Sequence, residues 1–192
     1  MYAQNNEDES YHKYIDMEKT DGKYIDIGAG SAIEISNTYI LYKMGWKGLC
    51  VEPNSHYTAD WKRERPNDIL ITQPIMDVEA EFSMASTVMP GSWLYEDYIK
   101  NNTATFLAQS LTLAHLLELY PDFYEVDLFS LDVELSEDKV LATANFEIFK
   151  PKLIIIEKQV RGINSKPNWE HLILPFYDNV EEFPGNTFYL RK

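Results

Sequence analysis

The sequence predicts an α/β fold, with a doubly wound and mostly parallel sheet that carries helices on both faces. Short apolar runs alternate with helical segments, which is the pattern of βαβ units. Three of these runs, at 23–27, 49–52 and 153–157, are predominantly apolar, as expected for parallel strands that are buried on both faces. The 192 residues are 45% hydrophobic, which is enough for one domain over residues 1–192 with a sizeable core.

The first part of the chain is predicted to alternate strands and helices after a helical lead-in at residues 1–20. A turn at 20–22 precedes the first strand. Gly45 is expected to follow the first helix as its C-cap, and Pro66 ends the second helix. The predicted elements are a strand at 23–27, a helix at 36–45, a strand at 46–53, a helix at 55–65 and a strand at 68–73.

Residues 74–111 are harder to interpret, and within them 77–86 is predicted to form a short β ribbon. Thr112 is expected to N-cap the next helix, which Pro121 closes. The remaining elements are predicted as a helix at 112–120, a strand at 126–132, a helix at 136–146, a strand at 152–157 and two further strand candidates at 171–177 and 186–192.

The chain is strongly acidic, with 31 Asp and Glu against 17 Lys and Arg and a net charge of -14. Such a surface repels phosphate backbones, and the basic run at 62–65 is short and interrupted by Glu64. We therefore expect no nucleic-acid partner.

Cys50 is the single cysteine, so no disulfide can form within the chain, and a reducing, cytoplasmic location is expected. The first ten residues have no signal-peptide pattern, and apolar runs such as 153–156 are too short to span a bilayer. We expect no membrane association, and the sequence carries no signal for an oligomeric state.

Four acidic residues stand at or next to the ends of predicted strands: Asp26, Glu52, Asp132 and Glu157. In open parallel sheets, ligands bind beyond the carboxyl ends of the strands, where the strand order reverses. We therefore expect these carboxylates to share one cleft.

A glycine turn follows the first strand, with Gly28 and Gly30 placed so that the backbone can pass close to a ligand. Glu52 ends the next strand, where a carboxylate can accept both hydroxyls of a ribose. Dinucleotides and S-adenosylmethionine are both held by this combination. Three details favour S-adenosylmethionine: Ile33 replaces the last glycine of the dinucleotide pattern, Asp26 precedes the turn, and no positive charge stands near it to balance a pyrophosphate.

Several segments, in order, resemble the FkbM-type methyltransferase family, within the class I S-adenosylmethionine-dependent group. The opening 2–9 is similar to the family's Ser-Gln-x-x-x-Asp-type segment. Residues 24–54 match its Asp-x-Gly-Ala turn, Ser-Asn-Thr helix start, Gly-Trp-x-Gly and Glu-Pro. The segments "TLAHLL", "LFSLDVELSEDKVL", "KPKLIIIE" and "NTFYLRK" also resemble the family. The resemblance implies a Rossmann-like fold of the class I methyltransferase type, with an antiparallel C-terminal strand.

The resemblance also implies a set of cofactor-binding residues around the glycine turn. Glu52 would hold the ribose, and Asn37 would face the same cleft from the start of the following helix. The other members are Asp26, Gly28, Ala29 and Gly30 for the methionine part, and Gln73 and Ile75 for the adenine.

Two positions depart from the family pattern. Where the family reads Gly-Ala-Asn-x-Gly, Gly30 takes the Asn position and Ala32 the later glycine. An alanine with positive φ would be strained, so Gly30 is expected to supply that conformation. Leu135 replaces a glycine beside the expected reaction site and narrows it.

Asp132 and Glu134 are the predicted catalytic residues. Methyl transfer aligns an acceptor with the methyl group and, for a hydroxyl, removes its proton; either carboxylate could be the base, or both could orient the acceptor. A hard cation on Asp132, Glu134, Glu157 and His56 is an open alternative. The variable segment 78–111 is expected to cover the acceptor with aromatics such as Phe82, Trp93, Tyr95 and Tyr98, or to pack them on the sheet edge.

These observations predict an S-adenosylmethionine-dependent methyltransferase that acts on a hydroxyl of a small molecule or carbohydrate. Two alternatives stay open. One is a nicotinamide-dependent oxidoreductase, and the other is a non-catalytic cofactor-binding or interaction protein on the same fold.

Overall fold

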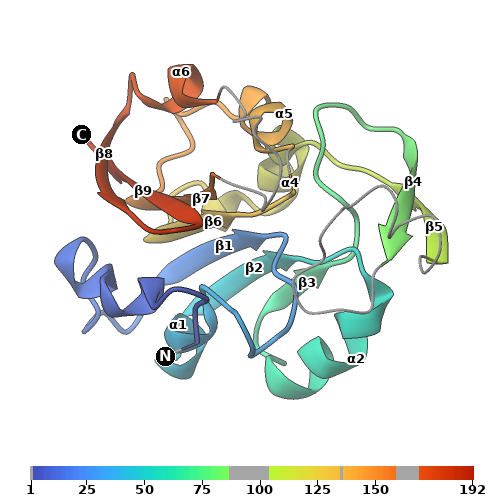
Figure 1. The fold of residues 1–192 in the computed structure, drawn as a ribbon, viewed down its shortest axis with the longest axis horizontal. Helices are drawn as coiled ribbons and strands as arrows, with labels where there is room; N and C mark the ends of the chain where they lie inside the picture. The colour runs from blue at the N-terminus through green and yellow to red at the C-terminus, as the bar shows by residue number, and fades with distance from the viewer. Residues whose placement is uncertain (1, 87–103, 135, 159–168) are drawn as a thin grey trace.

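The computed structural model describes residues 2–86, 104–134, 136–158 and 169–192. A seven-stranded sheet, in the order β3-β2-β1-β6-β7-β9-β8, forms the centre of the molecule (Figure 1). Its strands are β1 (Lys23–Ile27), β2 (Lys47–Val51), β3 (Ile69–Ile71), β6 (Leu128–Leu131), β7 (Leu153–Glu157), β8 (Tyr177–Glu182) and β9 (Asn186–Arg191).

The sheet is parallel from β3 to β7, and β9 is antiparallel to β7. The chain builds outward from β1 to β3 and then crosses back to place β6 on the other side of β1. The strand order therefore reverses between β1 and β6, which is where open α/β sheets bind ligands. This order and the antiparallel C-terminal strand confirm the doubly wound, Rossmann-like prediction.

Helices cover both faces of the sheet, as predicted (Figure 1). One face carries α1 (Tyr39–Lys43), α2 (Ser55–Glu64) and the lead-in, with a core that includes Tyr11, Leu41 and Trp61. The opposite face carries α4 (Leu113–Leu119), α5 (Glu137–Ala142) and α6 (Glu170–Ile173). Successive strand residues alternate between the two cores, so Ile25 faces α4 and α5 while Tyr24 faces α1 and α2.

Local signals for the helix ends agree with the structure in most places. The Thr112 hydroxyl accepts the amide of His115 at 3.1 Å and caps α4, and Gly45 follows α1 with φ +87°. The first helix is shorter than predicted, because Ser36 accepts the amides of Thr38 and Tyr39 and holds a turn before α1.

The strand prediction at 171–177 is wrong. Residues Glu170–Ile173 form α6, and β8 begins only at Tyr177. Trp169 and Ile173 are both buried against the core under α5, and their spacing of four residues suits one face of a helix.

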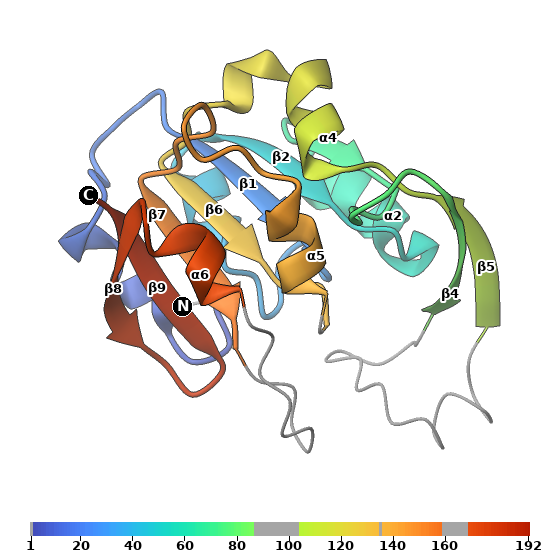
Figure 2. The same cartoon turned by 90° about the horizontal axis from the view of Figure 1, so that it is seen from above.

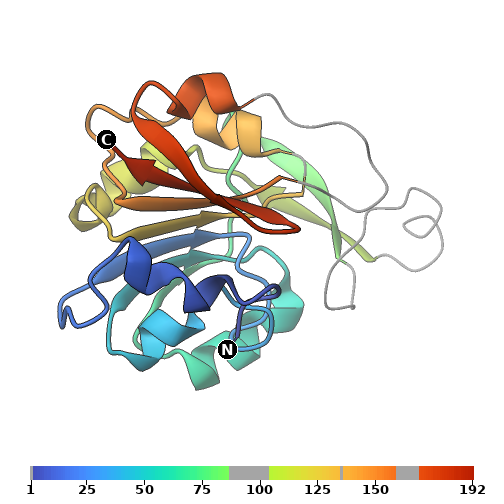
Figure 3. The same cartoon turned by 60° about the vertical axis from the view of Figure 1, so that its left-hand side comes forward.

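The lead-in is not a continuous helix but two short 3-10 turns, η1 (Glu7–Glu9) and η2 (Tyr11–Lys13). Figure 3 shows this segment passing across the face of the sheet that α1 covers. Glu7 is fully buried and accepts a hydrogen bond from Asn186 Nδ2 at 2.6 Å, so the lead-in is joined to the first residue of β9.

The predicted ribbon is present as β4 (Glu81–Ser86), which pairs with β5 (Ala104–Gln109) rather than within 77–86. It extends from the end of the sheet to which β1 and β6 point (Figure 2). Its base is held by Ser110, whose hydroxyl donates to the Val78 carbonyl at 2.6 Å.

Within the described part of the chain, no helix has both the length and the apolar character that a membrane crossing requires.

Candidate functional site

The turn after β1 needs glycine at positions 28 and 30 for different reasons. Gly28 has φ +81°, and a Cβ there would overlap the carbonyl oxygen of Asp132 at the end of β6. Gly30 has φ +57°, and the space on its Cβ side is open. As expected, Gly30 is the residue that adopts the left-handed conformation. Ala32 is buried and does not have a positive φ, so its backbone is not strained. Gly28 therefore serves the packing of two strands, while Gly30 leaves room for a ligand.

Glu52, directly after β2, is fixed against this turn. One carboxylate oxygen accepts the Gly30 amide at 2.7 Å, and the other accepts the Asn54 amide at 2.6 Å. Burial, together with the negative charges of Asp26 and Asp132, raises the Glu52 pKa to about 6. Each carboxylate oxygen keeps a further lone pair, so Glu52 can still accept hydrogen bonds from a ligand.

Asp26 does not reach the edge of the sheet but points to the core beneath α1. Its carboxylate accepts the Thr38 hydroxyl at 2.5 Å and is only 4% exposed. Burial raises the Asp26 pKa, and the hydrogen bonds from Thr38 and Ser130 oppose that rise. This placement favours a role in supporting the turn over direct contact with a ligand.

Asn37 is placed between the lead-in and β6. Its side-chain amide donates to the Ser130 hydroxyl at 3.1 Å, and its carbonyl accepts the Tyr11 hydroxyl at 2.7 Å. Tyr11 is fully buried. The lead-in thereby packs against the segment that follows the glycine turn.

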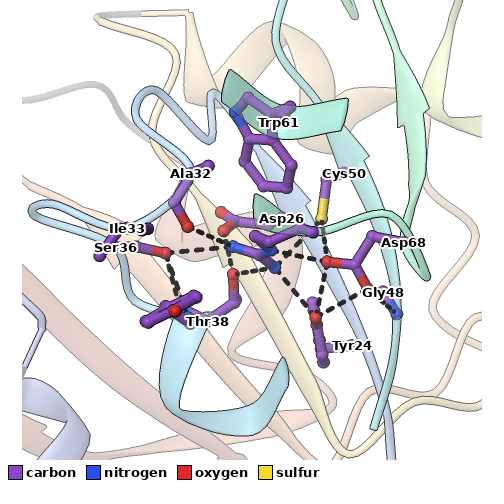
Figure 4. A network of polar contacts seen from close by, with 12 residues as sticks. Tyr24, Asp26, Ala32, Ile33, Ser36, Thr38, Gly48, Cys50, Trp61 and Asp68 are labelled. Atoms are coloured by element: carbon purple, nitrogen blue, oxygen red, sulfur yellow. Dashed lines mark hydrogen bonds and ion pairs between the residues drawn. The ribbon is translucent and has the colours of Figure 1, made fainter. Parts of the chain in front are cut away.

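Arg65, at the C-cap of α2, is almost fully buried. Figure 4 labels its partners Tyr24, Thr38 and Asp68. Its guanidinium pairs with Asp68 at 2.7 Å and donates to the hydroxyls of Tyr24 and Thr38 at 2.9 and 3.0 Å. It also lies 4.1 Å from the ring centre of Trp61. Sequence reasoning missed this residue, which stood in a basic run; its one local signal is the position before Pro66, at the end of a helix.

A second set of carboxyl groups gathers at the ends of β6 and β7. Carboxylate oxygens of Asp132, Glu137 and Glu157 lie within 4.8 Å of one another. Asp132 and Glu157 are hydrogen-bonded, and burial with the charge of Asp132 raises the Glu157 pKa to about 10. Burial and the charges of Asp132 and Glu137 raise the Glu134 pKa to about 8. At neutral pH this set therefore holds protons, and Asp132 and Glu157 share one.

The predicted cation set of Asp132, Glu134, Glu157 and His56 is not brought together in that form. Glu137 replaces Glu134 in the group that the described residues form, and the His56 ring packs against Tyr57 on exposed α2. The spacing of the three carboxylates would admit a cation. A proton shared by Asp132 and Glu157 explains their close approach equally well, so we assign no metal. No role was predicted for Glu137, although it stands in the segment "LFSLDVELSEDKVL" that resembles the family and in the first turn of α5.

The two predicted adenine residues have different environments. Gln73 is exposed and its amide donates to the Gln109 carbonyl at 3.5 Å, at the base of the β4–β5 ribbon. Ile75 is buried in the same core cluster as Ile27 and Val51. The described contacts place Gln73 beside the ribbon and Ile75 beneath the strand ends, and none of them joins either residue to the glycine turn.

Some predicted features fall outside the described residues. Leu135, Trp93, Tyr95 and Tyr98 are among them, as is the side chain of Phe82. The described edge nevertheless brings together Glu52, Asp132 and Glu157, which follow or end β2, β6 and β7.

Comparisons with known proteins identify related sequences and folds. The family model described as Methyltransferase FkbM domain matches residues 26–176. The chain is similar to a TehB-like SAM-dependent methyltransferase from Corynebacterium glutamicum, with 11% identity, 91% of this chain and 82% of that chain covered, and a TM-score of 0.48. It is also similar to the Methanococcus jannaschii fibrillarin pre-rRNA processing protein, with 14% identity, coverage of 92% and 69%, and a TM-score of 0.48. No curated protein matches at a significant level.

Replacement of the two turn glycines tests their separate roles. Gly28→Ala combines a strained backbone with overlap on the Asp132 carbonyl and should lower the free energy of unfolding by about 3 kcal/mol or more. Gly30→Ala meets open space and should cost about 1–2 kcal/mol for its positive φ alone. Urea denaturation of both variants measures the difference. Equal losses would contradict the packing role of Gly28.

The carboxyl set predicts how stability depends on pH. A carboxyl with a raised pKa binds protons more tightly in the folded chain than in the unfolded chain, where the Glu pKa is about 4.3. Glu157 should therefore lower the free energy of unfolding as pH rises from about 5 through its folded pKa of about 10. Melting temperatures at pH 6 and pH 9 should differ less in Glu157→Gln than in the wild type. Glu125→Gln makes the same substitution at an exposed position outside this set and should keep the wild-type difference; if it matches Glu157→Gln, the assignment is wrong.

Proposed function

Because the chain belongs to the FkbM methyltransferase family, we propose that it binds S-adenosylmethionine at the carboxyl ends of β1 and β2 and methylates a hydroxyl of a small molecule or carbohydrate. The observation that carries this proposal is Glu52, which is held against the glycine turn with lone pairs left for a ribose. The alternative of a nicotinamide-dependent oxidoreductase is not favoured by the family or by Ile33 at the position of the third glycine.

The residues around the turn have the chemistry that this cofactor requires. Gly30 leaves open space where a ligand can approach the backbone. Glu52 can accept the ribose hydroxyls, and the acidic groups nearby suit a cofactor that carries a sulfonium and an ammonium but no phosphate. Arg65 makes its described contacts in the interior, so it is not arranged as a pyrophosphate partner.

The acceptor would bind next to Asp132 and Glu134, at the end of β6. The bound cofactor supplies an electrophilic methyl group, and the acceptor oxygen must lose its proton as the new bond to carbon forms. Asp132 is the base in this proposal, and Glu134 orients the acceptor hydroxyl. Burial raises the pKa of Asp132, although the hydrogen bond from Glu157 opposes that rise, and a raised pKa strengthens a carboxylate as a base near neutral pH. Burial and the charges of Asp132 and Glu137 raise the pKa of Glu134 to about 8.

The β4–β5 ribbon is proposed to border the acceptor, since it extends beyond the strand ends where Asp132 lies (Figure 2). An acidic edge disfavours polyanions, so the proposed acceptor is a small molecule or carbohydrate and not a nucleic acid. The free, buried Cys50 fits a reducing compartment, and we propose a cytoplasmic location.

Calorimetry with S-adenosylhomocysteine tests the cofactor. We expect saturable binding to the wild-type protein at micromolar to millimolar concentrations, and no binding of NAD. An absence of binding at millimolar S-adenosylhomocysteine would remove the proposed function. Binding without methylation of any acceptor in a broad hydroxyl panel would point to the non-catalytic alternative.

Glu52→Gln tests the ribose contact. The amide keeps the size of the side chain but loses charge and one acceptor site, and the affinity for S-adenosylhomocysteine should fall by about 1–3 kcal/mol. Wild-type affinity should also fall as pH is lowered through about 6, where Glu52 becomes protonated. Unchanged affinity in the variant and a flat pH profile between 5 and 8 would exclude Glu52 as the ribose ligand.

A further inference from the structure

We propose that Trp61 and Arg65 of the α2 segment are positioning residues for the cofactor turn: they hold the backbone of residues 30–38 in its binding conformation without touching the cofactor. This inference rests on the proposed function, because the turn is taken to be the cofactor site. It concerns residues that no motif of the sequence singles out.

The first link runs through both sides of Gly30. Trp61 Nε1 donates to the Gly30 carbonyl at 2.8 Å, and the Gly30 amide donates to Glu52 at 2.7 Å. Gly30 has no side chain to pack, and its left-handed conformation is one of several that glycine adopts readily. The two hydrogen bonds therefore hold the peptide groups on either side of Gly30, and the one from the Gly30 amide also sets where the Glu52 carboxylate lies.

The second link joins the Trp61 ring to the rest of the segment. The Arg65 guanidinium stacks on that ring and donates to the Ala32 carbonyl at 3.5 Å and the Ser36 hydroxyl at 3.3 Å. It also donates to Thr38, which in turn donates to Asp26. One side chain thus contacts the segment at three points between the turn and α1 (Figure 4).

The other side of the guanidinium is anchored to the sheet. Its Nε pairs with Asp68, whose side chain is also fully buried, and the Asp68 carboxylate accepts the backbone amide of Gly48 in β2 at 2.9 Å. A second donor of Arg65 binds the hydroxyl of Tyr24 in β1. Since water does not reach these groups to replace a lost partner, movement of residues 30–38 away from the sheet would leave buried donors unsatisfied.

A purely structural role would make these residues matter for stability alone. A positioning role predicts in addition that cofactor affinity falls when the contact to Gly30 is lost, even if the fold is retained. The chain offers a matched comparison in Trp46, which is equally buried in the same core cluster and donates its Nε1 to the Lys19 carbonyl at 2.7 Å. Lys19 precedes β1, at the opposite end of the strand from the glycine turn.

The test compares Trp61→Phe with Trp46→Phe. Each variant keeps an aromatic ring and loses one indole hydrogen bond to a backbone carbonyl, so melting temperatures should fall by similar amounts. Calorimetry with S-adenosylhomocysteine should show about tenfold weaker binding for Trp61→Phe and wild-type affinity for Trp46→Phe. Equal affinities in the two variants would overturn the proposal while leaving the proposed function intact, whereas failure of the wild type to bind would remove both.

A double-mutant cycle separates positioning from general destabilisation. If Trp61 acts through Gly30 and Glu52, the loss caused by Trp61→Phe should shrink in a Glu52→Gln background. Strict additivity of the two losses would contradict this route.

Arg65→Lys, which keeps the charge but not the planar fork, provides a second variant if Trp61→Phe does not fold. It should raise amide hydrogen exchange at residues 30–38 of the ligand-free protein and weaken S-adenosylhomocysteine binding together. Wild-type exchange and affinity in Arg65→Lys would also count against the proposal.

Discussion

The arrangement of this fold around the glycine turn depends on one buried cation. Arg65 and Asp68 are both inaccessible to solvent at their charged ends, and an ion pair without water is tolerated only when neighbouring groups satisfy its remaining donors and acceptors. Those groups come from β1, β2 and the segment before α1. Requirements on nearby residues follow directly: a Cβ at Gly48 would meet the Tyr24 ring and the Asp68 carboxylate, which explains the second glycine of the Gly-Trp-x-Gly motif.

Much of the fold could be predicted because its signals are local. The apolar strands 23–27 and 153–157, the Thr112 cap and Gly45 all depend on a few neighbouring residues, and the structure agrees with each. The failure at 171–177 has a physical cause. A short apolar run does not distinguish a strand from a buried helix, and here Trp169 and Ile173 face a core formed by distant parts of the chain.

The candidate site likewise contains residues that the sequence could locate and residues that only the folded structure places. The glycine turn and Glu52 could be located from the sequence, since both follow strands whose ends converge in a parallel sheet. The direction of Asp26 could not, because side chains alternate along a strand and only the completed sheet decides which core each one enters. Arg65 and Trp61 were not predicted for a related reason: their importance comes from partners distant in the chain, such as Gly30 for Trp61 and Tyr24 for Arg65.

The hydrogen bond between Glu7 and Asn186 joins residues 179 positions apart. Contacts of such long sequence separation form late, because a large loop must close before they contribute any favourable energy. During synthesis, the lead-in is made long before β9, and Glu7 cannot meet its partner until β9 has followed. The face of the sheet beside α1 therefore stays open until the last strand has been made, and a chain arrested before that point would expose apolar residues such as Tyr11 and Leu128 to aggregation.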